Sequence, residues 1–304
     1  MIAVKIAPLV VVMVALLGVV GAQTTDIRSR VVDAAVSLQF NVRGRFDENR
    51  TRVGARALAA EWLRGSNGKV SQARCSGTFI FYGTGEKRRA LILTASHCVE
   101  SSRRVLTRIG DDGKEKKIVV YDDAQFSYTV IKQGRKVGEV SGVAKVLACG
   151  EPEEQGGDDL ALLEALDPDM GKGQAEIIPA DKPYDLGATA WNCSTLWGEF
   201  SGSLLTGIVS SRGFIFENKA FDTTNLSVRP GSSGSGFHVV VDGKPYLAGV
   251  ITRWDGRGAF GMAVPIERLR AWLIATGYGR LAGERTGLSR DLLEPKPAKE
   301  TPVP

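Results

Sequence analysis

Residues 229–237, Arg-Pro-Gly-Ser-Ser-Gly-Ser-Gly-Phe, decide the fold and the chemistry that we predict for this chain. Glycines 231 and 234 flank two serines, Ser232 and Ser233. Glycine adopts backbone conformations that bulkier residues resist, so this loop can fold closely around one hydroxyl and direct successive amide N–H groups into one space. A serine nucleophile is usually presented in this way.

A serine hydroxyl is a weak nucleophile at neutral pH, so it needs a histidine as base and a further group that orients the histidine. The chain contains two histidines. His97 lies in the run Leu-Thr-Ala-Ser-His-Cys at 93–98, and Asp159 opens the run Asp-Leu-Ala-Leu-Leu at 159–163. We therefore predict a site composed of His97, Asp159 and Ser233.

These three segments, in the order His, Asp, Ser, resemble the signature segments of the chymotrypsin-like (trypsin-like) serine proteases, over roughly residues 30–275. The resemblance implies that Ser233 attacks a peptide carbonyl while His97 takes its proton and Asp159 holds the imidazole. It also implies an oxyanion hole formed by the amides of Gly231 and Ser233, and no metal or cofactor.

Within that family, the segments at 207–211, 230–234 and 261–265 resemble the HtrA/Deg branch and other bacterial stand-alone members. Those proteases usually have Asn before the nucleophile and Gly-Gly-Pro after it, whereas this chain has Ser232 before it and Gly-Ser-Gly after it. Fewer than 40 residues follow Pro265, too few for a PDZ domain.

Short β-rich runs separated by Gly, Asp and Asn clusters favour an all-β fold, and the resemblance implies two six-stranded β-barrels with a short C-terminal helix. The predicted strands are 31–40, 78–82, 90–94, 118–121, 128–132, 143–148 and 160–163, then 188–191, 207–211, 236–241, 246–251 and 258–264. Helical spacing predicts helices over 55–64 and 265–274. Residues 166–187 are expected to cross between the barrels.

Residues 1–22 combine Lys5, an apolar run over 6–20 and small residues near Ala22, which predicts a cleaved secretory signal. An uncleaved anchor is the alternative, although the apolar run is shorter than the ~20 residues that a membrane span needs. We expect an exported protein, periplasmic or extracellular, without stable membrane insertion. The expected domains are a protease domain at 27–280, with barrels at about 30–165 and 185–265 and a closing helix at 266–276, and a disordered tail at 281–304.

The chain contains four cysteines, which allow three pairings. In an exported chain they indicate an oxidising compartment. The resemblance implies a bridge between Cys75 and Cys98, beside the catalytic histidine. Cys149 and Cys193 would then pair by elimination, or both would remain buried thiols.

The formal net charge of +5 raises the question of a nucleic-acid partner. The basic residues are scattered among acidic ones, and no aromatic residues accompany their clusters, so we interpret them as solvated surface. The partners that we expect are polypeptide substrates, with no nucleic acid.

Each site residue has a competitor in the sequence. Asp158 competes with Asp159, although the acid directly before the apolar strand fits the family pattern better. Ser232 and Ser235 compete with Ser233, which the Gly-x-Ser-Gly frame favours. His238 competes poorly with His97, because five residues of strand would carry it roughly 16 Å away from Ser233.

Two other functions compete with that of an active peptidase. A catalytically inactive family member acting as a protein-binding module is the main alternative, and the presence of all three candidate residues disfavours it. An esterase with the α/β-hydrolase fold would need a Gly-x-Ser-x-Gly elbow and a histidine last in order, and the chain misses that frame.

The resemblance places the floor of the specificity pocket at Ser227 and one wall at Thr252, Arg253 and Trp254. Ser227 carries no carboxylate that could pair with Lys or Arg, so apolar substrate side chains are preferred. Arg253 could point inward and recruit acidic side chains, but a solvated orientation is favoured. Ser232 has no charge to receive a new N-terminus, so we expect activity without maturation beyond signal removal.

Overall fold

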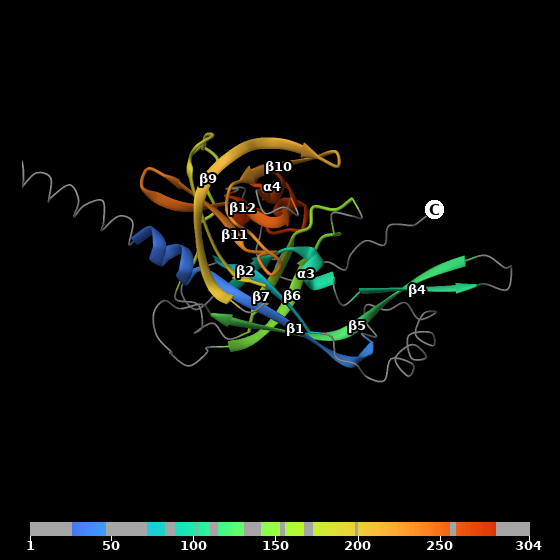
Figure 1. Ribbon diagram of the computed structural model, residues 1–304. Coiled ribbons are helices and arrows are strands. Elements are labelled where there is room, and N and C mark those ends of the chain that lie inside the picture. The colour runs from blue at the N-terminus through green and yellow to red at the C-terminus, as the bar shows by residue number, and fades with distance from the viewer. Residues whose placement is uncertain are drawn as a thin grey trace, which may run out of the picture.

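The computed structural model describes residues 26–46, 72–82, 89–100, 103–109, 115–130, 141–152, 156–166, 173–197, 200–255 and 260–283. Strands dominate these ranges (Figure 1). The predicted signal segment at 1–22, the predicted helix at 55–64 and residues 284–304 of the predicted tail lie outside them. In the described part of the chain, no helix is long and apolar enough to cross a membrane.

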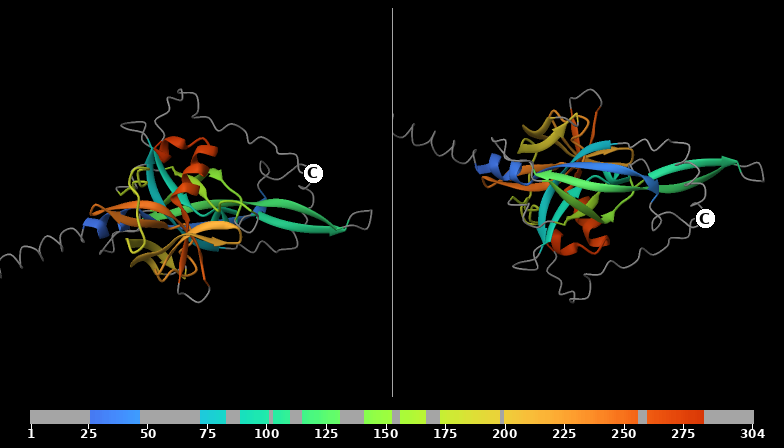
Figure 2. Two further views of the ribbon diagram at one scale, coloured as in Figure 1. Left: turned by 90° about the horizontal axis from the view of Figure 1, so that it is seen from above. Right: turned by 90° about the horizontal axis from the view of Figure 1, so that it is seen from below.

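The first sheet has the order β1-β2-β3-β7-β6-β5-β4, and an additional pairing of β1 with β5 closes six of these strands into a ring. Its strands are β1 (Ala35–Phe46), β2 (Gln72–Tyr82), β3 (Arg89–Thr94), β4 (Arg103–Ile109), β5 (Glu115–Val130), β6 (Ser141–Cys149) and β7 (Ala161–Ala165). The seventh strand, β4, pairs only with the first part of β5, and this hairpin projects from the body of the molecule (Figures 1 and 2).

The second half of the chain forms a closed barrel with the order β10-β13-β12-β11-β8-β9. Its strands are β8 (Thr189–Leu196), β9 (Phe200–Phe216), β10 (Lys219–Thr224), β11 (Gly236–Val241), β12 (Lys244–Trp254) and β13 (Gly261–Pro265). Asp242 and Gly243, both with positive φ, make the turn between β11 and β12 that the sequence predicts. The predicted all-β chymotrypsin-like fold is confirmed.

Strands β3 and β7 explain how the two halves meet. Side chains along a strand alternate between its two faces. On β3, Ala90 and Ile92 belong to the core of the first barrel, whereas Leu91 and Leu93 belong to a cluster that continues into the second barrel. Because both faces of β3 and of β7 are buried, the sequences of these two strands are almost continuously apolar. The loops that follow β3 and precede β7 lie between the barrels.

Helices are few in the described ranges. Residues 26–33 are helical, so the predicted strand at 31–40 is wrong at its start: Val31 and Val32 are adjacent residues that a helix buries together against Cys193 of the second barrel. The closing helix α4 (Ile266–Ala275) agrees with its prediction, with Leu269 and Trp272 among its buried residues. A 3₁₀ turn, η5 (Gly279–Ala282), follows it and includes the first residues assigned to the tail.

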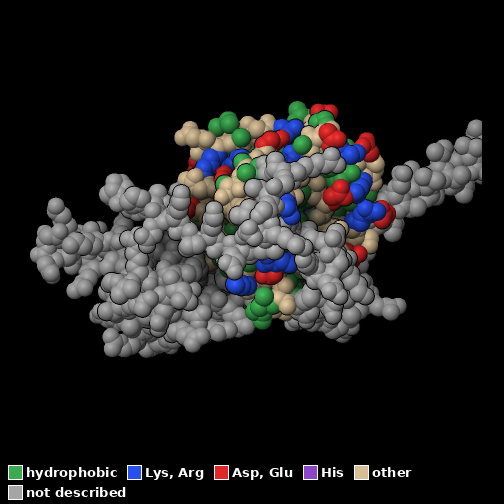
Figure 3. Space-filling model, turned by 180° about the vertical axis from the view of Figure 1, so that it is seen from behind, with side chains coloured by type: hydrophobic (Ala, Val, Ile, Leu, Met, Phe, Trp, Pro, Cys, Tyr) green, Lys and Arg blue, Asp and Glu red, His purple; other side chains and the backbone are tan. Residues whose placement is uncertain are grey.

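The surface of the described part carries both signs of charge. Figure 3 shows Lys and Arg side chains interspersed with Asp and Glu over the coloured part of one face. Several of them form ion pairs, such as Lys182 with Asp242 at 2.6 Å and Arg212 with Glu267 at 2.8 Å. This distribution is the one that the scattered basic residues of the sequence predict.

Candidate active site

His97 and Asp159 meet between the two barrels. His97 lies on the short helix α3 (Ser96–Glu100), directly after β3, and Asp159 lies two residues before β7. The distance from His97 Nδ1 to Asp159 Oδ2 is 2.7 Å. The other carboxylate oxygen accepts hydrogen bonds from the His97 amide at 2.8 Å and from the Ser96 hydroxyl at 2.9 Å. The carboxylate therefore fixes both the ring and the start of the helix that carries it.

The two groups differ in their exposure to solvent. Asp159 is 2% exposed, whereas the His97 side chain is 38% exposed. The Asp159 backbone has φ +54°, a left-handed conformation that few residues other than glycine adopt but that Asp tolerates. A buried carboxylate with three hydrogen bonds holds an accessible imidazole in one orientation, with Nδ1 directed at the acid.

Asp158, the competing acid, points elsewhere. Its Oδ1 accepts hydrogen bonds from the Arg268 guanidinium of α4 at 2.9 and 3.0 Å. The structure thus brings Asp159 to His97 and places Asp158 in a surface ion pair.

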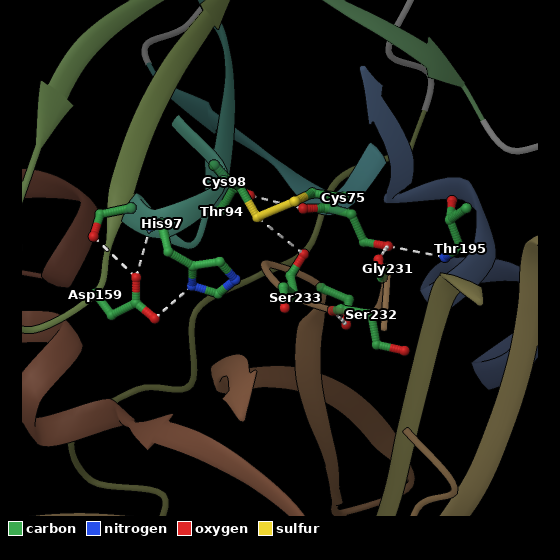
Figure 4. The surroundings of a disulfide bond; sticks show 12 residues. Cys75, Thr94, His97, Cys98, Asp159, Thr195, Gly231, Ser232 and Ser233 are labelled. Carbon is green, nitrogen blue, oxygen red and sulfur yellow. Dashed lines mark hydrogen bonds and ion pairs between the residues drawn. A yellow bond between two sulfur atoms is a disulfide. The ribbon is translucent and has the colours of Figure 1, made fainter. Parts of the chain in front are cut away.

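Ser233 comes to the same place from the second barrel. Figure 4 shows the imidazole of His97 with Asp159 on one side and Ser233 on the other. The described contacts include no hydrogen bond between the Ser233 hydroxyl and His97. In sites of this kind that bond often forms or tightens only when substrate binds.

The loop around Ser233 is compact because of its glycines. Gly231 and Gly234 have φ +94° and +86°. A Cβ on Gly234 would lie 2.0 Å from Thr94 Oγ1 and 2.3 Å from the Ser76 carbonyl oxygen, so the loop passes against β2 and β3 with no room for a side chain. The Ser76 amide donates to the Ser233 carbonyl at 2.8 Å. These contacts link the loop of the second barrel directly to the first.

A disulfide joins Cys75 to Cys98, the pair that the family resemblance implies (Figure 4). It ties β2 to the helix that bears His97, with a sequence separation of 23. Cys149 and Cys193 keep their thiols, so their pairing by elimination is wrong. Cys149 ends β6 in the first barrel and Cys193 lies on β8 in the second, where burial raises the pKa of its thiol to about 12.

The serines and the histidine that compete for the site in the sequence are buried elsewhere in the second barrel. Ser232 is 1% exposed, and its hydroxyl lies 3.2 Å from the Ser194 hydroxyl. Ser235 is fully buried and donates to the Ser232 carbonyl at 2.6 Å. His238 is 4% exposed inside the second barrel, and neither ring nitrogen has a close, well-aligned hydrogen-bond partner among the described residues. Burial lowers the pKa of His238 to about 4, against smaller opposite effects of the Gly236 and Trp191 backbones.

The residues expected to form the specificity pocket separate into two groups. Ser227 is exposed, whereas its neighbour Val228 is 2% exposed. Thr252 is 5% exposed. A Cβ on Gly261 would lie 2.9 Å from a Val228 methyl, so β13 passes directly against Val228. The buried side chain at this place is therefore Val228, which is also uncharged.

Arg253 and Trp254 lie at the outer end of β12. The Arg253 guanidinium pairs with Glu217 at 3.1 Å and lies 5.4 Å from the centre of the Phe216 ring. Trp254 is half-buried beneath the guanidinium of Arg229, at 5.7 Å. The partner Glu217 lies in the turn between β9 and β10, and no local pattern in the sequence indicates this contact.

Sequence reasoning also missed Ser76 and Asn192, two fully buried polar residues beneath the Ser233 loop. The signal that could have found Ser76 is its place directly after Cys75.

Within the described ranges, no group of three or more His, Cys, Asp or Glu residues could hold a metal ion.

Comparisons with known proteins agree with this arrangement. A family model described as a trypsin-like peptidase domain matches residues 75–244, a range that contains His97, Asp159 and Ser233. The comparison with curated proteins found no match. Among solved structures, the HtrA-type protease AlgW with a tripeptide is similar in fold, with a TM-score of 0.52 and 18% identity over 84% of this chain. The chain spans 63% of that protein's length.

The matched range covers more than half of the 304 residues, and the two barrels are the fold that this family model implies. The chain belongs to the family of trypsin-like peptidase domains.

Proposed function

We propose that the protein is an exported serine endopeptidase in which His97, Asp159 and Ser233 form the catalytic triad. The observation that carries the proposal is the contact of His97 Nδ1 with the buried Asp159 carboxylate, 2.7 Å long, on the side of the ring away from Ser233 (Figure 4). An imidazole held in this way has its second nitrogen available to take the serine proton.

The reaction proceeds through an acyl-enzyme. Ser233 Oγ attacks the peptide carbonyl carbon as His97 takes its proton, and the negative charge develops on the carbonyl oxygen. The amides of Gly231 and Ser233 stabilise that oxygen; within the described ranges, neither amide donates a hydrogen bond to another residue. His97 then delivers the proton to the leaving amine, and water hydrolyses the ester by the same steps.

The substrates that fit are polypeptides with an apolar side chain before the scissile bond. Val228 and Thr252 are buried and uncharged, and the charge of Arg253 is matched by Glu217. A buried carboxylate that could receive Lys or Arg is not among these residues. The disulfide supports export, because such bonds persist in oxidising compartments. The active unit is the domain at 27–280 after loss of residues 1–22.

Fluorophosphonate labelling of a protein that begins at Gln23 tests the proposal. Peptide mapping should locate the adduct on Ser233, and Ser233→Ala should abolish both labelling and peptide hydrolysis. A folded protein that takes up no label would instead be an inactive family member that binds polypeptides. An adduct on Ser232 or Ser235 would contradict the assignment of the nucleophile.

A further inference from the structure

The end of strand β8 and two side chains that β8 contacts hold the three successive peptide planes of the proposed oxyanion hole. In a trans peptide the N–H points opposite to the C=O, so a hydrogen bond that fixes a carbonyl also fixes the direction of the next residue's amide. The two proposed donors are the amides of Gly231 and Ser233. Their directions are therefore set by whatever holds the carbonyls of Pro230 and Ser232.

The first plane is held by the end of β8. The Trp197 amide donates to the Pro230 carbonyl at 2.6 Å. Trp197 follows directly after β8 and has φ +56°, which a bulky residue adopts only when its surroundings enforce it. The Pro230 carbonyl therefore points toward Trp197, and the amide of Gly231 points the opposite way.

The second plane, between Gly231 and Ser232, carries no donor of the hole but joins the two planes that do, and it is held through a buried serine. The Ser76 hydroxyl donates to the Gly231 carbonyl at 2.8 Å and accepts from the Thr195 amide of β8 at 2.8 Å. Because Ser76 is 0% exposed, water cannot replace the hydroxyl if it is removed.

The third plane is held by Ser235 and Asn192. The Ser232 carbonyl accepts from the Ser235 amide at 3.0 Å and from its hydroxyl at 2.6 Å. That hydroxyl accepts from Asn192 Nδ2 of β8 at 2.7 Å, and Nδ2 also donates to the Gly236 carbonyl at 2.8 Å. Asn192 and Ser235 are both 0% exposed. The amide of Ser233 thus takes its direction from Ser235, whose hydroxyl is in turn held by Asn192 of β8.

We propose that β8 preforms the oxyanion hole, with Ser76 and Asn192 as positioning residues that act through the carbonyls of Gly231 and Ser232. The inference rests on the proposed function and adds to it the source of the loop's rigidity. Ser232 is uncharged, and among the described residues its hydroxyl forms hydrogen bonds only with the neutral Ser194 hydroxyl and the Arg229 amide. The loop is therefore ordered by neutral hydrogen bonds from β8 rather than by an ion pair.

The test compares Ser76→Ala and Asn192→Ala with Ser211→Ala. Ser211 makes a 2.7 Å hydroxyl contact with Thr223 in the same barrel, away from the loop, so its loss controls for the removal of one hydrogen bond. Loss of one oxyanion donor costs about 10²–10³ in kcat, and a donor that is only misdirected costs less, so we expect about 10- to 100-fold for each variant. KM should be largely unchanged, because the ground-state carbonyl gains little from the hole.

The rate constant for fluorophosphonate labelling is the second readout. The phosphoryl oxygen of the reagent occupies the same hole, so labelling should slow by a factor similar to that in kcat, while Ser211→Ala should label at the wild-type rate. All rates are taken well below the melting temperature of each variant, since a purely structural role would lower the melting temperature and leave kcat intact. If Asn192→Ala does not fold, Ser76→Ala, which removes one oxygen atom, decides.

Two outcomes overturn the inference, and they differ. Wild-type labelling with unchanged labelling rates and kcat in both variants refutes the role of β8 and leaves the proposed function standing. A folded wild-type protein that takes up no label refutes the proposed function, and the inference falls with it.

Discussion

The two barrels hold their shares of the site by different physical means. The first barrel supplies His97 and Asp159 and fixes them with a buried charge and with the disulfide between Cys75 and Cys98. The second barrel supplies Ser233 on a loop whose only charged residue is Arg229 and which has no covalent link of its own, and neutral hydrogen bonds and the glycines hold the backbone around Ser233.

This difference predicts how each half fails. Charged hydrogen bonds are strong, and in the first barrel a few of them position the site residues. One substitution there should therefore remove most of the activity. In a network of neutral hydrogen bonds, many partners share the positioning of the loop. A single substitution in the second barrel should therefore reduce the activity only in part, unless it moves the backbone.

Asp159→Asn should abolish most of the activity. The amide cannot stabilise the imidazolium that forms during attack, and loss of the carboxylate in triads of this type lowers kcat by about 10⁴. The matched control is Asp158→Asn, which breaks only the ion pair with Arg268 and should keep near wild-type kcat. The opposite pattern, with Asp158→Asn inactive and Asp159→Asn active, would refute the assignment of the acid. Steady-state peptide hydrolysis measures both.

Gly234→Ala should unfold or inactivate the nucleophile loop. The new Cβ would lie 2.0 Å from Thr94 Oγ1 at φ +86°, so left-handed strain of about 1–2 kcal/mol adds to an overpacking cost of about 1–3 kcal/mol. Gly243→Ala is the control: its φ is +72° but no atom lies within 4 Å, so only the strain of about 1–2 kcal/mol remains. Denaturant unfolding compares the two, and equal losses would contradict the close approach.

Removal of the disulfide should destabilise the protein without eliminating chemistry. The Cys75→Ser/Cys98→Ser variant loses a cross-link with a sequence separation of 23, worth about 3 kcal/mol on the loop-entropy model. Cys149→Ser, which touches no disulfide, should change the free energy of unfolding far less. An equal loss in both variants would show that the bridge does not form in solution.

His238 should make the second barrel sensitive to acid. Its pKa is about 4 in the folded protein against 6.5 for an ordinary histidine, so between these values the unfolded state binds the additional proton. Stability should therefore be fully present above pH 6.5 and fall by up to about 1.4 kcal/mol per pH unit as the pH drops toward 4. His238→Leu should flatten this part of the stability profile, and an unchanged slope would contradict the burial of the ring.

The fold could be predicted largely because turn-forming residues separate its apolar strand segments. Buried runs such as 90–94 and 236–241 stand between turn residues and agree with β3 and β11 to within a residue. Strands β4 and β10 were missed, since Arg103–Ile109 and Lys219–Thr224 mix charged with apolar residues and show no clear alternation. The helix at 26–33 was missed because adjacent valines favour a strand locally, and only packing on the second barrel makes them helical.

The candidate site divides in the same way. His97, Asp159 and Ser233 could be named because family segments surround them, and the structure brings the first two into contact. The supports of the loop could not be named, because Ser76 and Asn192 lie 157 and 41 residues before Ser233 and meet it only through the pairing of strands.

The helix at 26–33 also limits how far the folded domain can be shortened from its N-terminal side. The strand that follows this helix, β1, belongs to the first barrel, whereas Val31 and Val32 of the helix pack against Cys193 on the second barrel. The helix therefore connects the two barrels. A protein that begins at residue 35 would keep every described strand but would lose the packing of Val31 and Val32 against Cys193. The Cys193 thiol, whose pKa burial now raises to about 12, would then meet solvent and become open to oxidation or alkylation. Trimming at the N-terminus would thus convert an inert cysteine into a reactive one.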